Sequence, residues 1–290
     1  MIYIAPMKAL VNEIVKKFSN ALGYLKLRIR ECTGDMQLSR AEIAETHLIV
    51  TTPEKWDVIT RKPENTMSQV RLMILDEIHL LNEDRGSVLE CLVARAMRTS
   101  EHTQLPIRLV GLSATLPNYH DVASFMMADS SSTFFFDESY RPTPLQYEFY
   151  GLKNMNNQQR ERQLLTDITF NIARRAVFAD KQVLVFVHTR NETIKTSEEL
   201  IEKMQREGSD TLFSGDNAWR FERDVNNSRN EKLKHFFKFG LGIHNAGMLR
   251  KDRNLSEALF ESGAIRVLVT TSTLAWGVNL PAHTVVIKGT

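Results

Sequence analysis

The sequence has only two cysteines and no long apolar run. These two features argue against a disulfide-rich secreted protein and against a membrane-spanning protein. Its two cysteines, Cys32 and Cys91, lack the paired spacing of a disulfide framework or a zinc site, so we expect an intracellular protein, nuclear or cytoplasmic, without a cysteine-bound metal. No apolar stretch approaches the roughly 20 residues that cross a bilayer, and the short apolar start at residues 1–5 lacks the basic flank of a signal peptide. We therefore expect no membrane partner.

A third absence concerns the binding of phosphate groups. A phosphate-binding loop has the pattern Gly-x-x-x-x-Gly-Lys-Ser/Thr, whose amides and lysine wrap the β- and γ-phosphates of a nucleotide. No Gly-Lys pair occurs in the sequence, and the two glycines with the right spacing, Gly242 and Gly247, are followed by Met248 and Leu249. These residues therefore supply no such loop.

The composition is otherwise ordinary for a globular protein, with 42% hydrophobic and 25% charged residues among 290. This length suggests two domains of typical size. The formal net charge is +2, but residues 1–143 are slightly acidic and residues 144–290 are slightly basic. The asymmetry weakly favours a polyanionic partner near the second half.

The first half of the chain alternates short β-rich runs with helical patterns, which predicts βαβ units and a parallel sheet covered by helices. The strands predicted there are 2–5, 28–32, 47–51, 70–75 and 107–112. The second half repeats this alternation, with predicted strands at 183–187, 265–271 and 284–287. Between the two series, Pro142 and Pro144 favour an extended connector. We therefore predict two α/β domains, residues 1–141 and residues 142–290.

The most informative segment is Asp76-Glu77-Ile78-His79, which directly follows the apolar run of residues 72–75. A short apolar run closed by two acids predicts a buried strand that delivers carboxylates to the carboxyl end of a sheet. Nucleotide hydrolysis needs acids there, one to hold Mg²⁺ and one to orient or deprotonate the attacking water. A strand followed by an acidic helix start explains the segment equally well, so the surrounding sequence decides.

Further short segments fall at predicted strand–helix junctions, where α/β domains build their sites. Each has a structural alternative: Thr52 and Pro53 suit the cap and first turn of a helix, and Ser113 to Thr115 can cap the helix that follows them. Their order favours the functional interpretation, because the structural alternative must be invoked seven times. The segments are residues 5–10, 33–35, 51–56, 113–115, 185–190, 242–248 and 269–281.

In this order the segments resemble the motifs of superfamily 2 helicases of the Ski2-like DExH group, and most closely those of the Brr2-like helicases. The resemblance covers nearly the whole chain. It implies two tandem RecA-like domains within a larger ATP-dependent nucleic-acid helicase that translocates 3′ to 5′, with ATP and Mg²⁺ as cofactors. It also implies that single-stranded RNA or DNA and a multiprotein complex are the partners.

The resemblance assigns roles to the residues of the nucleotide site. Asp76 would contact Mg²⁺ through water, and Glu77 would activate the hydrolytic water. His79, together with Ser113 and Thr115, would link the state of the nucleotide to closure of the two domains. These roles agree with the chemistry of paired carboxylates at the end of a buried strand.

A second set of roles concerns the other domain and the nucleic acid. Gly277 and Asn279 would approach the nucleotide from the second domain. Backbone amides at helix starts and threonine hydroxyls suit phosphate oxygens and carry no base information. The residues implied to hold the phosphates are Pro6, Lys8, Thr33, Gly34, Asp35, Thr52, Pro53, Glu54, Arg190, His244, Thr271 and Thr273. Asn245 and Ser272 replace the His and Ala that are usual in the family, and both are small polar changes.

In the family, the phosphate loop precedes the strand with which this chain begins, and an arginine-bearing motif follows the point where it ends. We therefore expect Met1 to be an internal residue of a longer protein. An arginine that stabilises the transferred phosphate can be worth about 10³–10⁵-fold in rate, so we expect the isolated chain to be inactive. We also expect a gap in the first sheet and exposed apolar surface. The alternative is a truncated, non-catalytic paralogue that acts as a nucleic-acid-binding or scaffold module.

Overall fold

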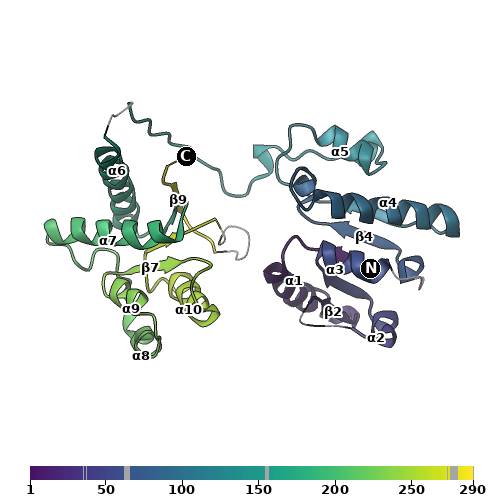
Figure 1. The fold of residues 1–290 in the computed structure, drawn as a ribbon, viewed down its shortest axis with the longest axis horizontal. Coiled ribbons are helices and arrows are strands. Elements are labelled where there is room, and N and C mark those ends of the chain that lie inside the picture. The colour runs from purple at the N-terminus through teal and green to yellow at the C-terminus, as the bar shows by residue number, and fades with distance from the viewer. Residues whose placement is uncertain are drawn as a thin grey trace. The chain divides into compact units, whose positions relative to one another are not determined.

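The computed structural model describes residues 1–34, 36, 38–61, 66–153, 157–272, 274 and 280–289 (Figure 1). They form two compact units, Met1–Gln146 and Tyr147–Thr290, and each unit has one sheet of parallel strands flanked by helices. The predicted fold class, two α/β domains in tandem, is confirmed. The predicted domain boundary after residue 141 stays a prediction.

The first sheet has the strand order β2-β3-β1-β4-β5, and every neighbouring pair runs parallel. In its register, Ile4 lies opposite Thr51 on β3 and Leu75 on β4. The residues that follow these strands therefore emerge at one edge of the sheet. The strands are β1 (Ile2–Ile4), β2 (Ile29–Cys32), β3 (Leu48–Thr51), β4 (Leu72–Leu75) and β5 (Arg108–Gly111).

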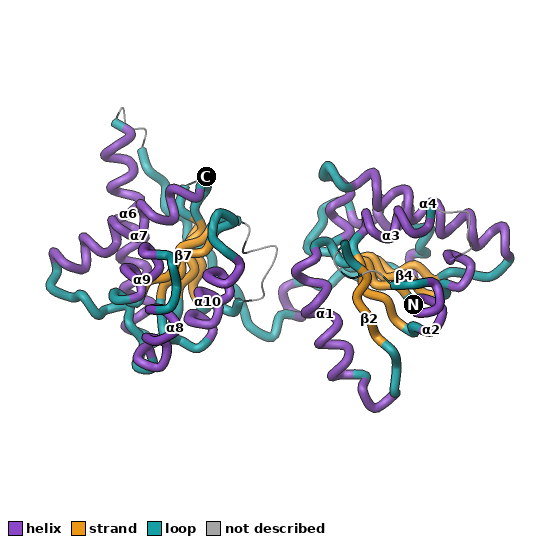
Figure 2. The backbone as a smooth tube through the Cα atoms, turned by 60° about the horizontal axis from the view of Figure 1, so that its bottom comes forward, coloured by secondary structure: helices purple, strands orange, loops and turns teal. Residues whose placement is uncertain are grey.

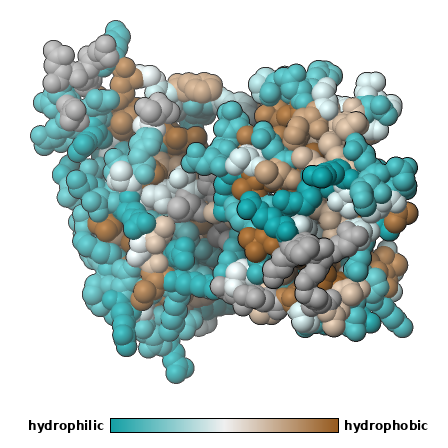
Figure 3. Space-filling view, turned by 45° about the vertical axis from the view of Figure 1, so that its right-hand side comes forward, coloured by the Kyte–Doolittle hydropathy of each residue, from teal (hydrophilic) through white to brown (hydrophobic). Residues whose placement is uncertain are grey.

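The expected gap in this sheet is wrong. Strand β1 pairs with β3 on one side and with β4 on the other, and β4 pairs with β5, so the described strands form a continuous sheet. Its outer strands are β2 and β5. The apolar surface expected at a missing strand stays a prediction. In the segment after β5, Phe134, Phe135 and Phe136 are all more than half exposed. Figure 3 shows apolar residues standing among polar ones on the face in view.

Helices cover both faces of the first sheet, because successive side chains of a strand point to opposite sides. Ile4 packs in a core cluster with Trp56 and Leu92, whereas Tyr3 packs with Val11 on the other face. The α-helices are α1 (Lys8–Ala21), α2 (Arg40–Glu45), α3 (Pro53–Thr60), α4 (Gly86–Thr103) and α5 (Tyr119–Phe125). The 3₁₀ helices are η1 (Gly23–Leu25), η2 (Thr66–Gln69), η3 (Ile78–Asn82), η4 (Ser130–Ser132) and η5 (Glu138–Tyr140).

The second sheet has the parallel strand order β7-β8-β6-β9, with helices around it (Figure 2). Its strands are β6 (Val183–Phe186), β7 (Leu241–His244), β8 (Val267–Thr270) and β9 (Thr284–Ile287). The helices are α6 (Gln158–Phe178), α7 (Arg190–Arg206), η6 (Ala218–Phe221), α8 (Glu222–Asn226), α9 (Glu231–Phe237) and α10 (Arg250–Glu261). Val185 and Val269 are fully buried in its core, whereas Val285 and Ile287 are exposed on the outer strand β9. Of the helices described, none combines the length and apolarity needed to span a membrane.

Candidate functional site

The segments that follow β1, β3 and β4 meet at the carboxyl edge of the first sheet. The backbone N–H of Ala5 donates to the carbonyl of Thr51 at 2.8 Å, and that of Asp76 donates to the carbonyl of Ile4 at 3.0 Å. In each bond, the first residue after one strand pairs with the last residue of the neighbouring strand. The segments that the sequence singled out therefore lie side by side.

Asp76 is held from two directions at this edge. Its Oδ2 accepts a hydrogen bond from Tyr3 Oη at 2.7 Å, and its Oδ1 accepts one from the backbone N–H of Glu77 at 3.0 Å. Tyr3 is buried on β1, and burial, then the hydrogen bond to Asp76, raises the pKa of its hydroxyl well above the ordinary value. No motif in the sequence marks Tyr3, because strand alternation shows only which face of the sheet a tyrosine takes.

Glu77 has a left-handed backbone, with φ of 53° and ψ of 46°. This conformation costs a non-glycine residue on the order of 1–3 kcal/mol and is concentrated at functional sites. Its Oε2 lies 3.3 Å from Nδ1 of His79, and Ser113 Oγ lies 3.5 Å from the same nitrogen. The structure thus brings three of the predicted residues together, while Thr115 is exposed.

Two further segments at this edge carry the phosphate contacts predicted for the first unit. Pro6 and Pro53 are buried, whereas Lys8 is exposed at the start of α1 and Thr52 is the partly exposed N-cap of α3. Glu54 is also partly exposed, in the first turn of α3. The backbone amides of two helix starts therefore lie at this edge, where such amides can bind an anion.

The segment after β2 adds a third part of this edge. Cys32 lies opposite Thr51, so the next residue, Thr33, follows at the same level. Thr33 is buried, and its Oγ1 has no hydrogen-bond partner in the described part of the chain. Such a hydroxyl is costly unless it is bonded to something else. The phosphate contact of Thr33 stays a prediction. Gly34 is exposed, and Asp35 lies outside the described residues.

In the second unit, Arg190 is the exposed first residue of α7. The start of this helix is fixed by a capping box, in which Thr189 and Glu192 exchange side chain–backbone hydrogen bonds. A Cβ atom added to Gly247 would lie 3.2 Å from Cδ of Arg190, so the arginine stem passes close to the turn after β7. The side chain of Arg190, which is predicted to contact phosphate, is thus exposed at the carboxyl edge of the second sheet.

The other residues predicted for this unit are less accessible. His244 and Thr271 are buried, and His244 Nε2 lies 2.8 Å from Oε1 of Glu257 on α10. The neighbouring Asn245 is also buried, and its amide donates to Thr193 Oγ1 at 3.0 Å. The phosphate contact of His244 stays a prediction. Three predicted residues lie outside the described part of the chain: Thr273, Gly277 and Asn279.

A pocket of about 380 Å³ opens beside Arg190, and Arg229 and Lys232 are among the residues that line it. Lys232 also pairs with Glu198 at 2.5 Å, and buried Asp252 lines the same pocket. The sequence analysis missed both cations, since they follow a polar, aperiodic stretch without a motif. A larger pocket of about 540 Å³ lies against α6 and contains none of the predicted site residues.

The contact between Tyr3 and Asp76 predicts how alkaline pH affects the first unit. Because folding raises the pKa of Tyr3, the hydroxyl stabilises the folded state below its unfolded pKa of about 10, and this contribution is lost as the pH rises further. Between pH 10 and 11, the wild type should lose up to about 1.4 kcal/mol more unfolding free energy than Tyr3→Phe. Urea unfolding followed by circular dichroism measures this difference. Tyr24→Phe, at an exposed position, should keep the wild-type loss.

Comparison with known proteins agrees with this geometry. The DEAD/DEAH box helicase family matches residues 1–122, and the helicase conserved C-terminal domain matches residues 162–289. The full chain is 49% identical to activating signal cointegrator 1 complex subunit 3 of Dictyostelium discoideum and covers 13% of that protein. It is 50% identical to the ATP-dependent RNA helicase DExH14 of Arabidopsis thaliana, over 14% of that protein. It is 47% identical to the RQC trigger complex helicase SLH1 of Saccharomyces cerevisiae, over 15% of its length.

Two parallel α/β domains in tandem, with paired carboxylates at the end of a buried strand in the first, fit the two helicase domains that these family models describe. The chain belongs to the DEAD/DEAH box helicases, a family of ATP-dependent enzymes that bind nucleic acid, and its resemblance to the Brr2-like members of the Ski2-like DExH group is confirmed. The chain spans about one seventh of the length of these relatives.

Proposed function

We propose that this chain forms most of the two-domain motor of an ATP-dependent RNA or DNA helicase. The proposal is carried by one arrangement: Asp76 and Glu77 at the carboxyl edge of the first sheet, with His79 beside them. In an acidic helix start without function, Glu77 would not need its strained left-handed backbone. The relative named as an ATP-dependent RNA helicase supports the same conclusion.

Asp76 suits Mg²⁺ bound through water. Carboxylate oxygens are preferred ligands of this ion, and each oxygen of Asp76 accepts one of the two hydrogen bonds above, which leaves lone pairs for water. Mg²⁺, when bound, neutralises the charge of the phosphates. Tyr3 fixes the orientation of Asp76, and Glu77 orients the attacking water and accepts its proton.

We propose that Lys8, Thr33 and Thr52 hold the phosphates of a single strand on the first unit, and that Arg190 does so on the second. Helix-start amides and hydroxyls bind backbone phosphates without reading the bases. We also propose, from the resemblance to Ski2-like helicases alone, that movement runs 3′ to 5′ along the strand. Arg229 joins this set, because it lines the same pocket as Arg190.

The proposal includes an intracellular protein that works within a multiprotein complex. Relatives named as a complex subunit and as a trigger-complex helicase motivate this part. We further propose that these 290 residues alone do not hydrolyse ATP, because no Gly-Lys pair wraps the β- and γ-phosphates.

Salt dependence of binding tests the contact with nucleic acid. We expect the chain to bind a labelled single-stranded oligonucleotide weakly, with an affinity that falls between 50 and 200 mM salt. Arg190→Gln and Arg229→Gln should each weaken binding and reduce the slope of log affinity against log salt by about 0.7, the value for one phosphate contact on a single strand. Fluorescence anisotropy measures both quantities.

Arg206→Gln is the matched control for this experiment. Arg206 lies at the far end of α7, is exposed and pairs only with Glu202 among the ion pairs described. Its substitution removes the same charge and should leave the salt slope unchanged. An affinity that does not respond to salt in the wild type contradicts the proposed phosphate contacts.

A further inference from the structure

Arg85 connects the two helix starts of the first unit to the segment that follows Glu77. Its Nη1 donates to the backbone carbonyl of Pro6 at 2.6 Å, and its Nε pairs with Oε1 of Glu54 at 2.8 Å. Arg85 itself is the N-cap of α4, three residues after η3 ends at Asn82. One guanidinium group therefore joins three segments that are 31 to 79 positions apart along the chain.

The backbone that carries Arg85 has little freedom to move. The next residue, Gly86, is buried, and its N–H donates to the carbonyl of Glu83 at 2.8 Å. A Cβ atom at Gly86 would lie 1.9 Å from the carbonyl oxygen of Leu81 in η3. At the other end of η3, the N–H of Ile78 donates to the carbonyl of Leu112. The backbone of Arg85 is thus packed directly against the turn that begins after Glu77.

The ion pair also explains why an acid stands among residues that hold phosphates. A carboxylate at a phosphate-binding edge repels the ligand unless a cation neutralises it. Arg85 does so for Glu54, and the planar guanidinium reaches the Pro6 carbonyl with a second nitrogen, which a lysine ammonium does not do in the same geometry. Both partners are nearly half exposed, at 48% and 42%, so the pair contributes at most about 1 kcal/mol.

We propose that Arg85 is a positioning residue that couples the phosphate-holding turns after β1 and β3 to the Glu77 turn. Binding of a single nucleic-acid strand at the Pro6 turn and at the start of α3 would thereby change the conformation or the stability of η3. This inference rests on the proposed function for the identity of the ligand, but the positioning role itself can be tested without a ligand.

The test is amide hydrogen exchange and oligonucleotide binding on the full chain with three variants: Arg85→Gln, Arg85→Lys and Glu54→Gln. In Arg85→Gln, exchange should become about fivefold faster at residues 5–10 and 52–58, which corresponds to about 1 kcal/mol. Arg85→Lys keeps the charge but loses the second nitrogen that reaches Pro6, so its exchange rates should resemble those of Arg85→Gln. Glu54→Gln leaves the bond to Pro6 intact and should affect residues 52–58 alone.

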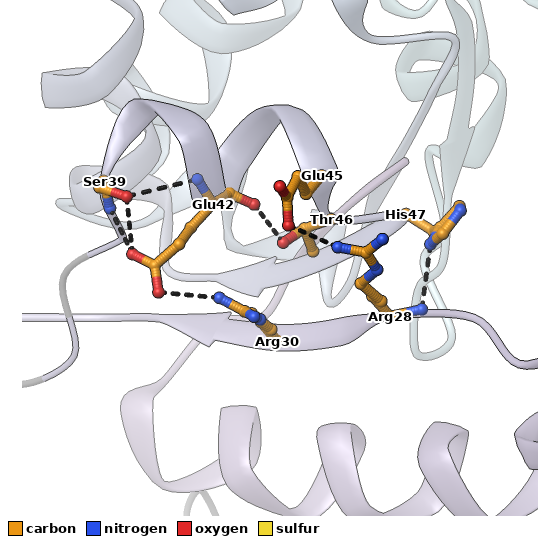
Figure 4. A network of polar contacts seen from close by, with 7 residues as sticks. All are labelled: Arg28, Arg30, Ser39, Glu42, Glu45, Thr46 and His47. Carbon is orange, nitrogen blue, oxygen red and sulfur yellow. Dashed lines mark hydrogen bonds and ion pairs between the residues drawn. The ribbon is translucent and has the colours of Figure 1, made fainter.

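The matched control is Arg28→Gln. Arg28 pairs with Glu45 at 2.5 Å, both partners are more than half exposed, and the pair lies beside the amino end of β2, away from the site (Figure 4). Its substitution should leave exchange at residues 5–10 and 52–58 unchanged. A single-stranded uridine oligomer should slow exchange at residues 78–86 in the wild type and in Arg28→Gln, but not in Arg85→Gln at saturating oligomer.

The outcomes separate this inference from the proposed function. Wild-type exchange at both turns in Arg85→Gln overturns the positioning role, whatever the oligomer does. Equal slowing at residues 78–86 in Arg85→Gln and the wild type overturns the coupling. If the wild type binds no oligomer at all, the proposed function is contradicted, and exchange in the absence of a ligand still decides the positioning role.

Discussion

Glu77→Gln is expected to slow nucleic-acid-stimulated ATP hydrolysis by at least about 100-fold, the lower range for loss of a general base. Glutamine keeps the size of the side chain and its hydrogen-bonding oxygen, but it cannot accept the proton of the attacking water. The neighbouring contacts of Asp76, from Tyr3 and from the backbone of residue 77, do not depend on the carboxylate. Steady-state ATP hydrolysis should be measured with the longest natural polypeptide that carries this sequence.

The matched control for this variant is Glu83→Gln, at the exposed C-cap of η3. It removes the same charge a short distance along the chain and should keep the wild-type rate. Binding of single strands should be unchanged in both variants, because neither acid is proposed to hold phosphate. If Glu77→Gln hydrolyses ATP at the wild-type rate, Glu77 is not the water-activating residue.

Gly86→Ala is expected to lower the free energy of unfolding of the first unit by about 3 kcal/mol, at the upper end of ordinary overpacking. The added Cβ would lie 1.9 Å from the carbonyl oxygen of Leu81 and 2.6 Å from its carbonyl carbon. Both atoms are backbone, so no side chain can rotate away to make room. Urea unfolding, followed by amide exchange in β1 and β4, measures the loss.

Gly23→Ala is the control for this substitution, since a Cβ atom added there meets no described atom within 4 Å. It removes a glycine from the same unit without overpacking and should change stability by well under 1 kcal/mol. Equal stability of the two variants would show that the corner between η3 and α4 adapts more easily than its geometry indicates.

The sequence sufficed for the fold class, because alternation of apolar runs and helical periodicity is a local property. The run predicted at residues 70–75 contains β4, and the predicted junctions lie at the carboxyl edge because all strands of a parallel sheet end there. The order of the strands is not local. The expected gap was wrong for this reason: β1 pairs directly with β4, whose partner residues lie 71 positions away in the sequence.

In the candidate site, too, local features could be predicted from the sequence and long-range contacts could not. The acids and threonines could be found from motifs, but the contacts that position them join residues far apart in the chain. Tyr3 reaches Asp76 across 73 positions, and Arg85 reaches Pro6 across 79. The burial of His244 against Glu257 likewise depends on how α10 packs on β7. No periodicity or spacing within a single segment encodes these pairings.

The left-handed backbone at Glu77 has a consequence for anyone who engineers this domain. Glycine, or to a lesser degree asparagine, adopts φ of 53° with little strain. Either residue at position 77 would therefore give a more stable fold than glutamate does. Selection for thermal resistance alone would therefore favour losing the very side chain to which we assign the chemistry. Position 77 is one where stability and activity pull in opposite directions, and a consensus-based or stability-ranked library should hold it constant.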